Sequence, residues 1–288
     1  MRVRTRVAVV AGGVVVAIVA LLGVWFVTKQ FGQHLRLPMA SRTCTVQADG
    51  RVVLSAEQMA NAATIAAIGV QRQMPERAVV VALATAYQES HLRNIAHGDR
   101  DSLGLFQQRP SQGWGTPEQV QDPRYAARKF YAALKKVRGW EEMRVTEAAQ
   151  RVQRSAYPEA YQKWADESEV LTRALLGDAT AAVACTVGLT PTMRGPAAAT
   201  ALVESLTLDW GLSGLTPPTD LTGFAVPAAD SRNGWRYAHW LVSHADDHGV
   251  KRVRFGDLEW TAEHGTWDKV KGSRAASTQV LAEVFAAT

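Results

Sequence analysis

Apolar side chains recur every three to four residues along most of this chain, a spacing that predicts helices with one buried face. Ser55 is followed by Gln58 in a capping-box pattern, so a helix is expected over residues 56–70. From Ala78 to Ala86 nearly every residue is apolar, which predicts that the helix over residues 75–89 is buried on all sides. The same spacing predicts helices over residues 122–137, 145–156, 159–177, 197–211 and 234–249.

The pattern changes near the C-terminal end, where shorter runs are typical of strands. Residues 250–256, 258–262 and 277–285 are three such runs. With the preceding helix they predict a small α/β module over residues 228–288. Residues 188–227 contain more Thr, Pro, Gly and Ala, and are interpreted as a linker that one helix interrupts.

The N-terminal end has a different composition. Val7 to Val27 is an uncharged run of 21 residues, about 31 Å long as a helix and enough to cross a roughly 30 Å hydrocarbon core. Arg2, Arg4 and Arg6 precede it, which by the positive-inside bias keeps the N-terminus in the cytoplasm. A cleaved signal peptide is the alternative, but its apolar region is about 7–15 residues long and small residues follow it. We expect a single-pass plasma-membrane anchor over residues 1–28, with the remaining chain extracytoplasmic.

The charge of the chain argues against nucleic acid as a partner. The net charge of the 288 residues is +5, and without the three arginines before the apolar run it is +2. The chain contains no arginine-rich cluster of the kind that binds a phosphate backbone. We therefore expect no nucleic acid as a partner, and expect the membrane as a partner through the N-terminal helix.

Two cysteines, Cys44 and Cys185, each open the tripeptide CTV. In an oxidising compartment such a pair usually forms a disulfide, although two unrelated buried thiols are the alternative. A bridge would close a loop of about 140 residues, worth about 4–5 kcal/mol in the chain-entropy model. The repeated tripeptide predicts two short strands side by side, joining the start and end of one domain.

These patterns divide the chain into five parts. The anchor is followed by an extracytoplasmic stalk with a first short strand over residues 29–50, and then by a helical domain over residues 51–187. The linker and the C-terminal α/β module complete the chain. The expected fold class is mainly α.

Glu89 is the first candidate for chemistry, because it stands at the C-terminal end of the most apolar helix outside the anchor. The negative end of the helix dipole and apolar surroundings both disfavour a charged carboxylate and raise its pKa. A general acid needs such a raised pKa near neutral pH. A surface glutamate at a helix end is the ordinary alternative, so the neighbouring residues decide.

Three motifs accompany this glutamate: Glu89-Ser90, Gly98-Asp99-Arg100 and Gly104-Leu105-Phe106-Gln107. Over roughly residues 55–165 they resemble the lysozyme-like superfamily, specifically soluble lytic transglycosylases and goose-type lysozymes. The family's usual GLMQ is GLFQ here, and Glu89 precedes Gln107 by 18 residues, a separation similar to that in transglycosylases. The run over residues 98–116 looks like a form found in membrane-anchored or secreted actinobacterial proteins.

The resemblance implies a lysozyme-like helical domain with a glycan cleft beside a small β-hairpin region around residues 99–109. The implied substrate is the glycan strand of peptidoglycan, with no cofactor. Glu89 would protonate the glycosidic oxygen between N-acetylmuramic acid and N-acetylglucosamine. Ser90 and Gln107 would orient the glutamate and the sugar.

Two product chemistries remain open at this point. A transglycosylase would use Glu89 again, as a base on the substrate's own 6-hydroxyl, and would leave a 1,6-anhydro end. An inverting hydrolase needs a second carboxylate about 6.5–9.5 Å away to hold water, and Asp99 and Asp101 are the candidates. Asp and Gly in the segment HGDRDS also favour tight turns, which is the ordinary explanation for both aspartates.

Sugar binding is expected from Tyr87, Gln107 and Trp114, the last by stacking on a sugar face. A loop tryptophan that fills the core is an equally common outcome.

The sequence departs from the family pattern at two places. Gln153 and Arg154 stand where the Tyr and Asn of the transglycosylase AYN triplet are expected. Gln108 and Arg109 replace the aspartate that goose-type enzymes often carry just after GLMQ. Gln108 and Gln153 are therefore counted as candidate substrate-binding residues, and the departures put the product in doubt.

His244 and His248 are four residues apart on one predicted helix, a spacing that can bind zinc. The segment HADDH lacks the glutamate of HExxH, and no third ligand is evident, so we expect no metal site. The C-terminal module resembles a small domain found behind secreted actinobacterial cell-wall hydrolases. Its last strand lacks the histidines of related forms, so it is interpreted as a binding or docking module.

Taken together, these residues favour an enzyme that cleaves peptidoglycan glycan strands, with Glu89 as acid and base. The alternative is a catalytically inactive cell-wall-binding or scaffold protein, which the missing AYN triplet favours. A third hypothesis is an accessory of a secretion or conjugation machine, with envelope machinery proteins as partners.

Overall fold

The computed structural model describes residues 42–155, 157–215, 223–270 and 278–287. Residues from Arg42 onwards form one compact unit. The anchor expected over residues 1–28 lies outside the described residues. Within the described ranges no helix is both long enough and apolar enough to cross a membrane.

A three-stranded antiparallel sheet ties the start of this unit to a segment 140 residues further along. β1 (Thr43–Gln47) and β2 (Arg51–Ser55) form a hairpin, and β3 (Val183–Cys185) pairs with the other edge of β1. Cys44 lies directly opposite Cys185, and the two form a disulfide. The expectation of two neighbouring strands joined by a disulfide is confirmed.

Two long helices follow the hairpin. α2 (Ala56–Gln71) begins at Ser55, whose side chain accepts from the Gln58 N–H while the Gln58 side chain accepts from the Ser55 N–H. The capping box expected from the sequence is therefore confirmed. α3 (Glu76–Ser90) follows after a short turn.

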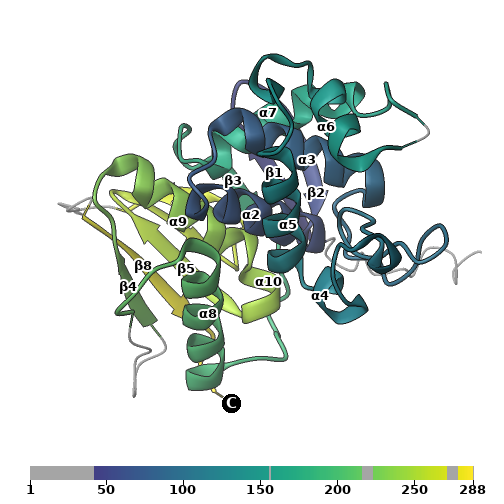
Figure 1. The fold of residues 1–288 in the computed structure, drawn as a ribbon. Helices are drawn as coiled ribbons and strands as arrows, with labels where there is room; N and C mark the ends of the chain where they lie inside the picture. The colour runs from purple at the N-terminus through teal and green to yellow at the C-terminus, as the bar shows by residue number, and fades with distance from the viewer. Residues whose placement is uncertain (1–41, 156, 216–222, 271–277, 288) are drawn as a thin grey trace, which may run out of the picture. The chain divides into compact units, whose positions relative to one another are not determined.

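α3 is the central helix of the first half of the chain. It packs against α2, α5 (Pro123–Leu134), α6 (Val145–Gln153) and α7 (Ala165–Leu175), as the ribbon in Figure 1 shows. Neighbours on several sides leave almost no position of α3 open to solvent before its last turn. This packing explains why the run from Ala78 to Ala86 is apolar at nearly every position.

The loop between α3 and α4 (Pro117–Gln121) contains no strand. An isolated bridge joins Leu103 to Gln108, and a short 3-10 helix follows at Pro110–Gln112. The β-hairpin expected around residues 99–109 is therefore wrong.

Amide side chains hold this loop instead of a strand ladder. Asn94 donates from Nδ2 to the Gln121 carbonyl (2.7 Å), and Gln121 donates from Nε2 to the Ile95 carbonyl (2.9 Å). Side-chain donors that reach backbone carbonyls satisfy the loop without regular pairing. The loop is thus irregular and at the same time well anchored.

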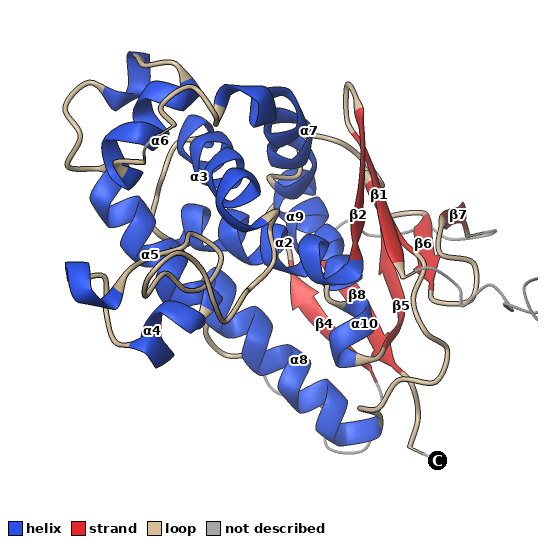
Figure 2. Ribbon diagram, turned by 90° about the vertical axis from the view of Figure 1, so that its right-hand side faces the viewer, coloured by secondary structure: helices blue, strands red, loops and turns tan. Residues whose placement is uncertain are grey.

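The C-terminal part contains a second antiparallel sheet, which covers one side of the helices in Figure 2. Its five strands lie in the order β4-β8-β5-β6-β7. The runs expected to form strands are confirmed as β5, β6 and β8, whereas β4 and β7 were not anticipated. The bounds are β4 (Gly223–Pro227), β5 (Val250–Phe255), β6 (Leu258–Thr261), β7 (Trp267–Lys269) and β8 (Gln279–Val284).

Three further helices lie in this part. The helix expected within the linker is confirmed as α8 (Gly195–Trp210), which packs against α2. α9 (Ser231–Ser243) contacts β5 and β8 as well as α2 and α7, so it lies between the sheet and the helices. α10 (Ala245–His248) follows directly.

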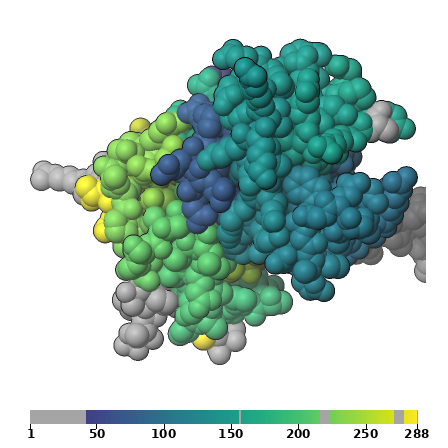
Figure 3. Space-filling view, in the orientation of Figure 1, coloured from purple at the N-terminus to yellow at the C-terminus, as the bar shows by residue number. Residues whose placement is uncertain are grey.

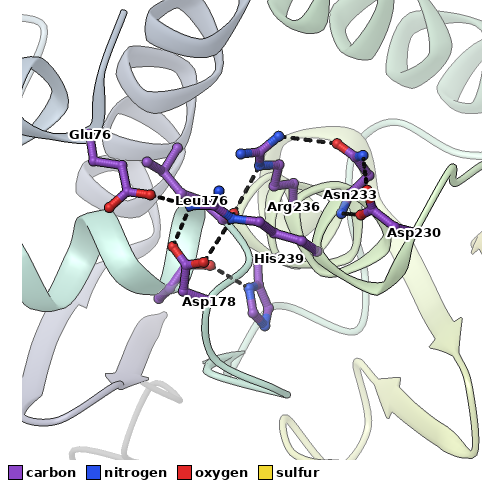
Figure 4. Close-up of polar contacts among 9 residues, drawn as sticks. Glu76, Leu176, Asp178, Asp230, Asn233, Arg236 and His239 are labelled. Carbon is purple, nitrogen blue, oxygen red and sulfur yellow. Dashed lines mark hydrogen bonds and ion pairs between the residues drawn. The ribbon is translucent and has the colours of Figure 1, made fainter.

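Polar contacts fix α9 against the end of α7. Arg236 donates from Nε to the Leu176 carbonyl at 2.8 Å, as Figure 4 shows. Arg232 pairs with Asp178 at 2.7 Å and also with Glu76, at the start of α3. The guanidinium groups thereby satisfy carbonyl and carboxylate oxygens left at the helix ends.

A buried carboxylate joins four helices. Asp209, near the end of α8, is fully buried and accepts hydrogen bonds from Thr64 of α2 (2.8 Å) and Trp240 of α9 (2.8 Å). Arg124 of α5 supplies the opposite charge. Burial raises the pKa of Asp209, and the arginine and the hydrogen bonds oppose that rise.

The expectation of a mainly α fold class is wrong. The described residues are 48% helix and 17% strand, and these strands form two antiparallel sheets. The unexpected strands arise from short segments whose pairing partners are distant in sequence, such as Gly223–Pro227 with Gln279–Val284. A short run of this kind gives little local signal, because its ladder is completed only by tertiary contacts.

Candidate active site

Glu89 lies in the last turn of α3, as the sequence predicted. The helix ends because His91 adopts a left-handed conformation (φ 53°), from which its N–H donates to the Tyr87 carbonyl while the Leu92 N–H donates to the Ala86 carbonyl. The Glu89 side chain is half-buried, whereas the side chains of Tyr87 and Ser90, close to it in the helix, are buried. One carboxylate thus stands at the negative end of an otherwise apolar helix.

A hydrogen bond holds the Glu89 carboxylate: the Tyr161 hydroxyl donates to Glu89 Oε1 at 2.7 Å. Burial raises the pKa of Glu89 above its ordinary value, while the Tyr161 hydroxyl and the nearby Gln153 amide favour the charged form and limit the rise. The carboxyl is therefore able to hold a proton and is also held in one orientation.

Burial holds the Tyr161 side chain in place. Its side chain is fully buried, and it immediately precedes the 3-10 helix Gln162–Trp164. Burial, followed by the Glu89 charge, raises the pKa of the tyrosine, so it acts as a neutral donor.

The GLFQ segment is hydrogen-bonded to Ser90, next to the glutamate, and to Gln153. Ser90 donates from Oγ to the Leu105 carbonyl at 2.8 Å. Gln153 donates from Nε2 to the Phe106 carbonyl at 2.8 Å, and the Phe106 ring stacks on Phe130 with centroids 4.8 Å apart. In Figure 3 the blue-teal surface of this loop lies directly beside the teal surface of α5 to α7. The motif residues recognised in the sequence are therefore neighbours in space.

Gly104 meets a steric requirement in this segment. Its φ is +75°, and a Cβ at this position would lie 2.3 Å from the Val120 carbonyl oxygen. No other residue fits both the left-handed backbone and the close approach.

Gln107 and Gln108 have structural contacts here. Gln108 is almost fully buried and donates from Nε2 to the Ala126 carbonyl at 3.1 Å. Gln107 donates from Nε2 to the Gly104 carbonyl at 3.2 Å and has a positive φ of 46°. Gln108 thus supports the loop from inside, whereas Gln107 remains partly accessible beside Gly104.

Tyr87 faces the core and not the solvent. Its ring stacks on Trp164, with centroids 4.8 Å apart and planes 8° from parallel. Trp164 donates from Nε1 to the Gln88 side chain at 3.1 Å, and its ring also contacts His91 edge-on. This stack packs against the last turn of α3, which carries Glu89. The Trp164 ring is partly exposed, so it offers an accessible aromatic surface.

The two aspartates of the loop have different surroundings. The Asp99 side chain is 91% exposed and lies 3.8 Å from the Arg100 guanidinium. Asp101 accepts from the Ser111 N–H (2.7 Å) and from Arg109 Nε (2.8 Å). The Ser111 hydrogen bonds and the Arg109 guanidinium hold the pKa of Asp101 well below its usual range. Asp101 is therefore charged at neutral pH, and its hydrogen bonds join two parts of the loop.

Trp114 lines a groove of about 760 Å³ that Gln153 also lines. The tryptophan is half-buried and packs against the core, so one part of the ring remains accessible. The groove thereby contains two of the residues that the sequence marked for substrate binding.

The sequence did not single out Tyr161. Its signal was available, because Ala160-Tyr161-Gln162 differs from the AYN triplet at one position, a few residues after the helix where the triplet was expected. Gln153, which stood at the expected position, lies near enough to affect the pKa of the glutamate. A tyrosine hydroxyl is therefore present at the glutamate although the triplet is absent from the expected position.

The histidines of the second half do not form a metal site. His244 is buried, stacks on Trp240 at 3.9 Å, and has Nε2 at 3.3 Å from the Thr64 hydroxyl. Its ring centroid is 6.2 Å from that of His248. No group of three or more His, Cys, Asp or Glu side chains in the described part of the chain is arranged to hold a metal ion.

Comparison with protein-family models gives no match, and comparison with curated protein sequences gives no significant match.

Proposed function

We propose that this protein cleaves the glycan strands of peptidoglycan at the bond between N-acetylmuramic acid and N-acetylglucosamine. The observation that carries the proposal is Glu89 itself, a half-buried carboxyl with a raised pKa that the Tyr161 hydroxyl holds in place. The resemblance of the surrounding motifs to lytic transglycosylases supports the choice of substrate. The Cys44–Cys185 disulfide supports a site of action outside the cytoplasm, because disulfides persist in oxidising compartments.

In the first step protonated Glu89 donates its proton to the glycosidic oxygen. The bond between C1 of the muramic sugar and this oxygen breaks, and its electron pair leaves with the oxygen, which becomes the 4-hydroxyl of the departing glucosamine. Positive charge develops at C1 and the ring oxygen. The new Glu89 carboxylate keeps the hydrogen bond from Tyr161, which stabilises its charge.

In the second step the Glu89 carboxylate removes the proton from the 6-hydroxyl of the same muramic sugar. The 6-oxygen forms a bond to C1 and closes a 1,6-anhydro ring. Glu89 is again protonated and the enzyme returns to its starting state. A single group with a pKa near the working pH is suited to act as acid and then as base.

The surroundings of the two aspartates favour this product over hydrolysis. An inverting hydrolase needs a second carboxylate that binds and deprotonates water. Both Asp101 oxygens already accept hydrogen bonds, and a carboxylate of depressed pKa is a weak base. Asp99 is almost fully exposed, and its carboxylate lies 3.8 Å from the Arg100 guanidinium.

Digestion of purified peptidoglycan by the full-length chain, with products measured by mass spectrometry, tests the proposal. Wild-type protein should release 1,6-anhydro muropeptides, and Glu89→Gln, which keeps the shape but cannot supply a proton, should lower the rate at least about 100-fold. Reducing ends in place of anhydro ends would point to a hydrolase. If folded wild-type protein releases no fragment, the proposed enzymatic function is overturned.

A further inference from the structure

The groove beside Gln153 is strongly basic. We call it the basic groove and define it by six of its lining residues: Trp114, Lys129, Lys136, Arg151, Gln153 and Arg154. No aspartate or glutamate lines it. Four cations from α5 and α6 and the turns that follow these helices thus face one space.

Carboxylates of the protein do not neutralise these cations. None of the four forms a salt bridge with an acidic residue that the structure describes. Lys129 lies over the Tyr125 ring at 5.2 Å. Arg151 is close enough to Glu147 to affect its pKa, but Arg144 contacts that glutamate directly at 3.1 Å. The groove therefore keeps a net positive potential.

The positive surface continues beyond the groove. A neighbouring recess shares Lys136, Arg151 and Arg154 with it and adds Arg138. Exposed cations at this density repel one another and gain free energy when an anion lies among them. Such a surface is adapted to an extended anionic ligand rather than to a single ion.

Gln153 connects the basic groove to the candidate active site. Its side chain lines the groove, donates to the carbonyl of Phe106 in the GLFQ segment at 2.8 Å, and lies near enough to Glu89 to affect the pKa of that carboxyl. A glycan strand with its scissile bond at Glu89 therefore has substituents within reach of the groove.

We infer that the basic groove binds the free carboxylates of the stem peptide carried by the muramic sugar. The inference rests on the proposed function. Stem peptides leave the muramic sugar close to the bond that breaks, and they carry several carboxylates when they are not cross-linked. A phosphate-linked wall polymer attached at the 6-oxygen is excluded on that sugar, because this oxygen must form the anhydro ring.

Affinity measured without turnover tests the groove separately from catalysis. The full-length Glu89→Gln chain is titrated with soluble glycan chains that carry tetrapeptides, and with the same chains after an amidase has removed the peptides. The test variant adds Lys136→Gln and Arg151→Gln, two exposed positions at the groove. The matched control adds Arg51→Gln and Lys269→Gln, two exposed cations outside it.

We expect tighter binding of the peptide-bearing chains, and a loss of about 3- to 10-fold of that affinity in the groove variant only. The preference should weaken as salt rises. Equal affinity for both glycans, or equal losses in variant and control, would overturn the inference. Tighter binding of peptide-free chains that carry a phosphate polymer would assign the groove to phosphate and overturn it too.

The cleavage assay separates the two proposals. If wild-type protein cleaves peptide-bearing and peptide-free glycan at the same rate, the proposed function stands and the inference about the groove fails. If wild-type protein cleaves neither but the affinity difference depends on the groove, the groove binds stem peptides and the enzymatic function fails.

Discussion

The Tyr161 hydroxyl donates a 2.7 Å hydrogen bond to Glu89 Oε1, although the two residues are 72 positions apart in the sequence. This contact joins the end of the central helix to the segment that leads into α7. It gives the half-buried carboxyl a neutral donor that stabilises the charged form. The balance between burial and this donor sets the pH range in which Glu89 can act.

Tyr161→Phe should move the alkaline limb of the activity profile to higher pH. Removal of the hydroxyl takes away a hydrogen bond that lowers the pKa of Glu89, so the raised pKa rises further. An acid with a higher pKa stays protonated to higher pH, and cleavage is lost only above it. The measurement is kcat/KM for glycan cleavage against pH.

Tyr131→Phe is the matched control for that variant. The Tyr131 hydroxyl is buried and donates to the Ile65 carbonyl at 2.9 Å, away from Glu89. Its loss should cost about 1–3 kcal/mol of stability and leave the alkaline limb in place. Equal shifts in both variants would contradict a specific role for Tyr161.

Ser90→Ala should lower kcat about tenfold by releasing the GLFQ segment from α3. The variant leaves the Leu105 carbonyl without its 2.8 Å donor and costs about 1–3 kcal/mol of stability. Thr85→Val on the same helix removes a buried hydroxyl that bonds only within α3. That control should lose stability without a comparable loss of kcat, and parallel losses in both would argue against the docking role.

Gly104→Ala should destabilise the chain far more than Gly113→Ala. Both glycines have positive φ, +75° and +80°, so both variants pay the backbone cost of about 1–2 kcal/mol. A Cβ at Gly104 also meets the Val120 carbonyl at 2.3 Å, whereas one at Gly113 meets nothing within 4 Å. Urea unfolding should separate the two by at least about 2 kcal/mol, and similar midpoints would contradict the steric account.

Reduction of the Cys44–Cys185 disulfide should lower the free energy of unfolding by about 2–5 kcal/mol. The bridge closes a segment of 141 positions and fixes β1 against β3, so its loss enlarges the unfolded ensemble. Denaturant unfolding with and without a reductant measures the difference. An unchanged midpoint after verified reduction would show that the sheet holds the two strands without the bridge.

Acid should destabilise the chain through buried His239. Its Nε2 accepts from the Ala182 N–H at 2.9 Å, Nδ1 lies 2.7 Å from the Ala174 carbonyl, and burial lowers the pKa of the ring to about 4. The stabilisation by the neutral ring is complete above about pH 6.5 and is lost as the pH falls towards 4. In this range the titration of His239 changes the free energy of unfolding by up to about 1.4 kcal/mol per pH unit.

His239→Gln removes this titration while keeping a donor and an acceptor. Its free energy of unfolding should depend less steeply on pH between 6.5 and 4 than that of the wild type. His97→Gln, at an exposed position, should keep the wild-type slope. Equal slopes in all three proteins would refute the assignment to His239.

The sequence by itself determined the local elements and the position of the candidate acid. The capping box at Ser55, the buried helix around Ala78–Ala86 and the pairing of Cys44 with Cys185 follow from nearby patterns or from rare residues. Glu89 was found because an apolar helix that ends in a carboxylate, with the GDR and GLFQ motifs shortly after it, is a local feature.

Tertiary structure alone decided what surrounds that carboxylate. Tyr161 reaches Glu89 only because α3, α6 and α7 pack together, and Asp101 is tied to the loop by Arg109 and the Ser111 N–H instead of facing an open site. The second sheet likewise depends on strands that are far apart in the chain, such as β4 and β8. Hydrogen bonds and burial between distant segments set pKa values and side-chain orientation, and a one-dimensional pattern carries little trace of them.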